Sequence, residues 1–159
     1  MTPTTGVPEE AEDLIAGAPV SAHFATSVDD RPHAAPVWYG YRDGVGSFIT
    51  GGRKLANARE NPRVALSIER ARDGDVDWSV TLLGRAAVVE DADRIEQASD
   101  WIYEKYDGEA DDPSEETGAG GDAAVDGGSE QSADPHATAD TEYALVEVTV
   151  GSASWAVYD

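Results

Sequence analysis

A basic segment inside a strongly acidic chain has the residue types needed to bind an anion. The chain of 159 residues contains 11 Lys and Arg against 32 Asp and Glu, a formal net charge of −21. Eight of the basic residues nevertheless lie within residues 31–72, where only three acidic residues occur. At the centre of this segment, residues 50–57 (TGGRKLAN) read as a glycine turn that opens into a short helix. Cationic side chains beside backbone N–H groups at the start of a helix suit a phosphate group.

Other chemical motifs do not occur in the sequence. There is no cysteine, which excludes disulfides, thiolate metal sites and cysteine nucleophiles. No HExxH metal spacing, GxSxG elbow or Walker loop is present. Acidic residues are scattered throughout, so no carboxylate pair of the glycosidase type stands out. We therefore assign neither catalytic residues nor metal ligands from the sequence.

The acid excess has two explanations. A highly charged surface stays hydrated in concentrated salt, as in proteins of halophiles, and an acidic chain can also serve as a partner-binding protein. Acids occur throughout the chain and only two lysines accompany nine arginines, which favours salt adaptation. In either case repulsion argues against nucleic-acid binding, which requires Lys and Arg to neutralise phosphates.

The sequence also bears on location. No run of about 18 apolar residues occurs, so no membrane helix is expected. The first 12 residues are polar and acidic and lack the order of a signal peptide. We expect a cytoplasmic protein that does not bind membranes.

Hydrophobic periodicity predicts a mostly β protein with flanking helices. Sequential strands joined by tight turns favour an antiparallel barrel or closed sheet with helices packed outside. A polar loop is expected over 71–77, and the tryptophan at 155 lies beyond the last expected strand. Helices are expected over 9–16, 54–60 and 91–106, and strands over 20–28, 33–42, 46–50, 63–69, 77–90 and 142–150.

Residues 107–141 differ in composition from the rest of the chain. They contain one large aliphatic side chain, Val125, and no Phe, Tyr, Trp, Lys or Arg. Such a segment cannot bury enough apolar surface to offset its ordering entropy. We predict a single domain over residues 1–159 in which 107–141 is a disordered acidic insertion before the last strand. An acidic docking segment is the alternative.

Three motifs, in order, resemble one known family. They are RPHAAPVW at 31–38, TGGRK at 50–54 and NPRVAL at 61–66. Together they resemble the FMN-binding split-barrel family of pyridoxamine 5′-phosphate oxidase-like proteins, which includes relatives that bind the deazaflavin F420. The resemblance covers about residues 10–106 and 142–156. It implies an antiparallel split β-barrel and a homodimer that holds FMN, or alternatively F420, between its protomers.

The resemblance also implies roles for particular residues. Pro36, Val37 and Trp38 would lie along the flavin ring, and Thr50, Gly51, Arg53 and Lys54 would hold the phosphate. Asn57, three residues after Lys54, would assist the phosphate or cap the helix. Trp155 would lie near the partner's cofactor or cap the barrel; Trp38 is equally consistent with core packing.

The function implied is an oxidoreductase that transfers hydride or electrons to a small molecule. The alternatives are a non-catalytic flavin carrier or sensor, and a haem-binding or haem-degrading relative with His33 or His136 as ligand. The turn at Gly51 is shorter than in many flavin-binding relatives, which leaves the choice between FMN and F420 open. The arginine and histidine pairs of true pyridoxamine-phosphate oxidases are missing, so a vitamin B6 enzyme is not expected.

Overall fold

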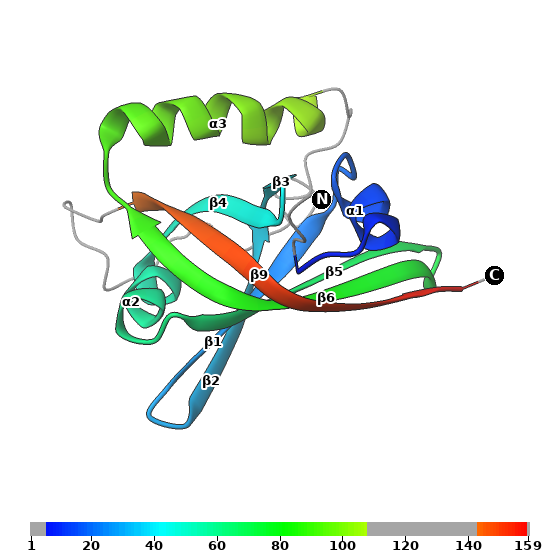
Figure 1. Cartoon of the computed structure of the whole chain (residues 1–159), viewed down its shortest axis with the longest axis horizontal. Coiled ribbons are helices and arrows are strands. Elements are labelled where there is room, and N and C mark those ends of the chain that lie inside the picture. Colours follow the sequence, from blue (N-terminus) through cyan, green and yellow to red (C-terminus); the bar gives the residue numbers. More distant parts are fainter. Residues whose placement is uncertain (1–5, 108–142, 159) are drawn as a thin grey trace, which may run out of the picture.

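The computed structural model describes residues 6–107 and 143–158. Within these ranges three helices accompany one seven-stranded sheet (Figure 1). The helices are α1 (Glu9–Ile15), α2 (Gly52–Glu60) and α3 (Ala92–Asp107). The strands are β1 (Ser21–Val28), β2 (Arg31–Trp38), β3 (Gly40–Arg42), β4 (Val45–Gly51), β5 (Arg63–Arg72), β6 (Asp75–Val89) and β9 (Tyr143–Val157).

The order of the strands explains why the sheet curls. The order is β2-β1-β5-β6-β9-β4-β3, and all pairings are antiparallel. β2 and β3 are therefore the two edges of the sheet, yet only Tyr39 separates them in the chain. Because one residue can span only a few ångströms, the sheet must bend until its edges approach each other. The result is the open, antiparallel split barrel predicted from the sequence.

The inner face of the sheet holds the main core. The rings of Phe24 and Phe48 meet there with their centroids 4.6 Å apart, surrounded by fully buried aliphatic side chains. Burying each such side chain contributes about 1.5–3 kcal/mol. α1 adds the buried Ile15, whose carbonyl accepts a 2.7 Å hydrogen bond from the buried Tyr39 hydroxyl. This bond fixes the point at which the chain passes from one edge of the sheet to the other.

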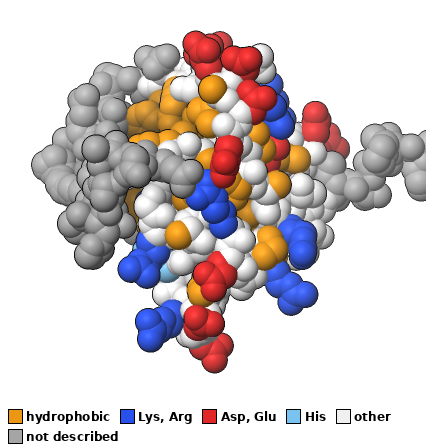
Figure 2. Space-filling view, turned by 90° about the vertical axis from the view of Figure 1, so that its left-hand side faces the viewer, with side chains coloured by type: hydrophobic (Ala, Val, Ile, Leu, Met, Phe, Trp, Pro, Cys, Tyr) orange, Lys and Arg blue, Asp and Glu red, His pale blue; other side chains and the backbone are white. Residues whose placement is uncertain are grey.

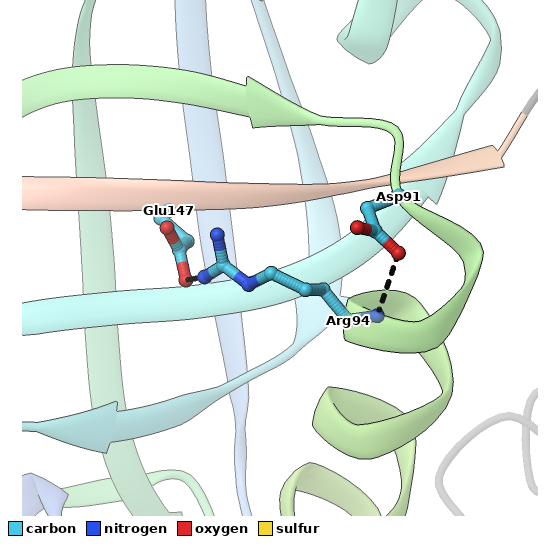
Figure 3. Close-up of polar contacts among 3 residues, drawn as sticks. All are labelled: Asp91, Arg94 and Glu147. Atoms are coloured by element: carbon cyan, nitrogen blue, oxygen red, sulfur yellow. Dashed lines mark hydrogen bonds and ion pairs between the residues drawn. The ribbon is translucent and has the colours of Figure 1, made fainter.

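α3 packs on the outer face, as Figure 1 shows. Its buried Ala98 and Ile102 form a second cluster with Leu145 of β9. At its N-terminus Asp91 accepts a 2.8 Å hydrogen bond from the backbone N–H of Asp93, which is the role of an N-cap residue. Arg94 forms a 2.6 Å ion pair with Glu147 of β9 (Figure 3). These contacts attach the start of α3 to the sheet.

The predicted loop over 71–77 is wrong. β5 continues to Arg72 and β6 begins at Asp75, so only two residues separate the strands. Both have positive φ, 52° at Asp73 and 86° at Gly74. Two successive left-handed residues make a tight hairpin turn whose twist matches that of the strands.

Other boundaries also differ from those expected, most of them by one or two residues. α2 begins at Gly52 rather than 54, and the strand expected over 33–42 is interrupted at Tyr39. β9 extends to Val157 instead of 150, because it pairs with β6 beyond a register shift at Leu83/Gly84. Of the insertion predicted over 107–141, Asp107 is the last residue of α3, and 108–141 lie outside the described residues.

Within the described parts of the chain, no helix is both long and apolar enough to span a membrane.

Candidate phosphate site

The site is built where β4 passes directly into α2. Thr50 points to the inner face and is 4% exposed, and Gly51 is the N-cap residue of α2. Gly52 has a φ of 65°, a left-handed conformation that glycine adopts without a Cβ penalty. The N-cap makes no side-chain hydrogen bond, and the first turn contains no acidic residue. The start of α2 therefore presents backbone N–H groups and the positive end of the helix dipole.

Two cationic residues belong to the same turn. Arg53 is exposed and Lys54 is half-buried. In Figure 2, which views the left-hand side of Figure 1, the Lys and Arg side chains are spread over the visible surface and acidic side chains lie between them. The face is thus not broadly basic. What distinguishes the start of α2 is the local combination of two cations, the glycine turn and the helix terminus.

A hydrogen bond holds α2 against the first hairpin. Asn57 donates from Nδ2 to Thr26 Oγ1 of β1 at 3.0 Å, and Thr26 is 4% exposed. Leu55 and Ala58 are buried on the same helix. Asn57 therefore positions the helix on the sheet. Its further role at a phosphate stays a prediction.

The same contact brings β2 to the site. Thr26 pairs with His33 across the β1–β2 ladder, so His33 faces the end of the barrel that α2 covers. Its Nδ1 is buried and has no hydrogen-bond partner among the described residues. The pKa of His33 is lowered, first by burial and then by the positive charges of Lys54 and Arg53. His33 thus lies close enough to the start of α2 for the charges of Lys54 and Arg53 to act on it.

The residues expected along a flavin ring lie on two faces of β2. Val37 is 8% exposed and packs in the core, so its side chain is directed inward. Pro36 is exposed on β2, an edge strand, which is where a proline is tolerated. Trp38 stacks on Tyr106 of α3 with centroids 4.1 Å apart and an interplanar angle of 3°. One face of the Trp38 ring is therefore covered by Tyr106.

Trp155 lies far from α2 of its own chain. On β9, Ala144 is opposite Thr50, whereas Trp155 is opposite Val80. At about 3.3 Å per residue, roughly 35 Å of strand separates these two positions. Trp155 is 37% exposed. It cannot complete the site at α2 within one protomer.

The outer face of the barrel carries a pattern that sequence reasoning missed. Two rows of directly opposed residues cross five strands and contain no Lys, Arg, Asp or Glu. We call them the outer rows: Ala34, Ala25, Ala65, Leu83 and Ser152 in one, and Pro36, His23, Ser67, Thr81 and Ser154 in the other. Leu83 is 53% exposed. In so acidic a chain, two adjacent rows without acids are unexpected for a face in contact with water.

Comparison with known proteins identifies the family. The model of the pyridoxamine 5′-phosphate oxidase family matches residues 8–155, and the chain belongs to this family. No curated protein matches the sequence.

Solved structures share the fold. An FAD-binding protein from Mesorhizobium loti aligns with a TM-score of 0.60 at 17% identity, covering 92% of this chain and 89% of that chain. An F420 reductase aligns with a TM-score of 0.59 at 22% identity, covering 93% of this chain and 98% of that chain. A conserved hypothetical protein from Mycobacterium tuberculosis aligns with a TM-score of 0.63 at 20% identity, covering 99% of this chain and 89% of that chain. At these identities the similarity shows the fold.

Proposed function

We propose that the protein is an oxidoreductase that binds FMN, or alternatively F420, and transfers hydride or electrons to a small molecule. The observation that carries this proposal is the convergence of Arg53, Lys54 and His33 on the uncapped start of α2. The family supports it, since its structural neighbours include an FAD-binding protein and an F420 reductase.

The residues present fit a phosphate group. Arg53 and Lys54 supply charge, and the turn at Gly51 and Gly52 leaves the first N–H groups of α2 without a side-chain cap. Charge-assisted hydrogen bonds of this kind are about twice as strong as neutral ones. The buried Nδ1 of His33 is a further polar atom without a partner among the described residues. The two positive side chains favour an anionic group at this site.

The protein's own part in the reaction is binding and orientation. A bound flavin or deazaflavin supplies the redox chemistry. Arg53 and Lys54 would anchor the phosphate, while Thr50 contributes a buried hydroxyl at the end of β4. Pro36 on the outer face would offer a flat apolar surface to the ring. Val37 can contribute through its backbone, because its side chain lies in the core.

We propose that the functional unit is a homodimer formed through the outer rows. These rows are free of charged residues, and they are flanked by Arg63 and Arg85 on one side and by Glu69 on the other. A two-fold axis could place the basic flank of one protomer against the acidic flank of its partner. Trp155 is too far along β9 to reach the site of its own chain, and its place near the partner's cofactor remains part of this proposal.

Turnover separates an enzyme from a carrier. The protein is loaded with FMN or F420, the cofactor is reduced without oxygen, and small quinone or nitro acceptors are added. Reoxidation faster than that of the same free cofactor supports an oxidoreductase. A bound cofactor that reoxidises no faster than the free one identifies the carrier or sensor.

We also infer that the acid excess is an adaptation to concentrated salt and that the protein acts in the cytoplasm. Screening of like charges should then stabilise the fold. The melting temperature is expected to rise steadily with KCl over the molar range. A flat or falling curve would remove the salt interpretation.

A further inference from the structure

We propose that His33 is the third basic ligand of the phosphate site and takes up a proton from solvent when the phosphate binds. This inference rests on the proposed function, because it presumes a phosphate-bearing ligand at the start of α2. It adds a residue outside the glycine turn, and it makes affinity dependent on pH.

The position of His33 follows from two independent contacts. The β1–β2 ladder places His33 opposite Thr26. The hydrogen bond from Asn57 to Thr26, at 3.0 Å, places α2 against that same point of the sheet. Asn57 lies one helical turn after Arg53 and Lys54, so the beginning of the helix is brought toward His33. The imidazole therefore lies beside the cationic turn although 20 residues of chain separate them.

The imidazole of His33 has a buried nitrogen that a ligand could satisfy. Its Nδ1 is buried and finds no partner among the described residues. A buried polar atom left without a partner is costly, and native structures generally satisfy such atoms. β1 presents the uncharged Thr26 opposite His33, and the charged groups whose fields act on it are Lys54 and Arg53 of α2. Both are positive, and an anion held between them and His33 would relieve this arrangement.

Binding would change the protonation of His33 in a definite direction. Without an anion, burial and the two cations keep the pKa of His33 below its ordinary value, so the ring is neutral at pH 7. A phosphate dianion favours the imidazolium and raises that pKa. The contribution of His33 to affinity is therefore complete below the pKa of the ligand-free state. It is lost as the pH rises through the higher pKa of the bound state.

Calorimetry tests this linkage with FMN as the probe. Titrations at pH 7.5 in two buffers of different ionisation enthalpy give the number of protons taken up. At this pH the phosphate, whose second pKa is about 6, is already a dianion. We expect net proton uptake by the wild type and its loss in His33→Gln. The variant should bind FMN about tenfold more weakly at pH 6.5, and the difference should shrink at pH 8.5.

A second variant separates charge from structure. His33→Arg keeps a positive charge at every pH. This variant should still bind FMN tightly. Its affinity should not vary with pH through the charge of residue 33, and binding should take up no proton. Urea unfolding of both variants identifies any loss of folding.

The outcomes distinguish this inference from the proposed function. If FMN binds tightly to the wild type without proton uptake, or His33→Gln takes up as many protons, the role of His33 is overturned and the function stands. If neither FMN nor F420, titrated in the same way, binds, both are overturned together.

Discussion

Asn57 of α2 and Thr26 of β1 are joined by a side-chain hydrogen bond of 3.0 Å. Thr26 is almost fully buried, and its cross-strand neighbour is His33. This one bond therefore relates the helix that carries Arg53 and Lys54 to the strand that carries the histidine. The bond therefore connects the two parts of the candidate site that are distant in sequence.

Removing this bond should affect both stability and binding. Asn57→Ala leaves the buried Thr26 hydroxyl without its donor, so the free energy of unfolding should fall by about 1–2 kcal/mol. FMN affinity should fall as well, because α2 is no longer held against β2. Urea denaturation and FMN titration give the two values.

A double-mutant cycle isolates the pair. In a Thr26→Val background, Asn57→Ala should lower the free energy of unfolding by markedly less than it does in the wild type. Equal costs in both backgrounds would show that the bond does not position α2.

Trp38 is predicted to stabilise the docking of α3. Its ring stacks on Tyr106, whose hydroxyl donates a 2.8 Å hydrogen bond to the Val20 carbonyl. Trp38→Ala should lower the free energy of unfolding by about 2 kcal/mol, below the range for a fully buried tryptophan because the residue is only half-buried. Trp38→Phe keeps an aromatic surface, so it should lower the free energy of unfolding by less. Unchanged stability with an altered absorption spectrum of bound flavin would instead show that the ring serves the cofactor.

The outer rows predict how the dimer can be broken. Leu83 is 53% exposed and lies between Ala65 and Ser152 in one of these rows. Leu83→Asp would place a charge in the proposed interface, and burial of an unpaired charge is strongly unfavourable. Sedimentation velocity should show the wild type as a dimer and this variant as a monomer. Arg72→Ala, at an exposed position away from the rows, is the control that should remain dimeric. A monomeric wild type contradicts the proposal.

Lys105 predicts how stability depends on pH. Its Nζ is buried 3.5 Å from the centroid of the Tyr39 ring, with no hydrogen-bond partner among the described residues. Burial lowers the pKa of Lys105 to about 7. The unfolded chain keeps this proton to about pH 10.4, so between these values it binds more protons than the folded chain. The free energy of unfolding should therefore rise with pH above about 7.

The upper end of this window is set by two tyrosines. Burial raises the pKa of Tyr39 and of Tyr106, so the folded state resists their ionisation and loses stability once tyrosines of the unfolded chain ionise. Urea midpoints between pH 6.5 and 9.5 avoid that range. Lys105→Met should flatten the rise of the free energy of unfolding with pH, and Lys54→Met should leave that rise unchanged. A wild-type slope that survives in Lys105→Met would assign it to other groups.

Much of the fold could be predicted because its signals are local. Asp91 is a favourable N-cap residue, and Val64, Leu66 and Ile68 alternate along β5, so both elements carry local signals in the sequence. The hairpin at 73–74 also carries a signal, since Asp73-Gly74 repeats the Asp43-Gly44 pair that joins β3 and β4. It was overlooked because the flanking residues are polar. The end of β9 was missed since its small residues are ordered by pairing with β6, which a single segment does not reveal.

The candidate site was predictable only in part. The glycine turn and its two cations are contiguous in sequence, so they could be identified together. His33 joins them through the β1–β2 register and the Asn57 contact, and both are long-range. The outer rows are invisible in sequence for the same reason: each member looks like an ordinary small residue of its own strand.

The central claim is that the start of α2 anchors the phosphate of a flavin or deazaflavin. The most direct test is a spectroscopic titration of wild type and Lys54→Ala, in high salt, with FMN, riboflavin and F420. We expect submicromolar binding of FMN or F420 to the wild type and a loss of about 1.5–3 kcal/mol in Lys54→Ala. Any weaker binding of riboflavin, which has no phosphate, should be the same in both proteins. Equal affinity of the two proteins for FMN and F420, or no binding of either, would contradict the account.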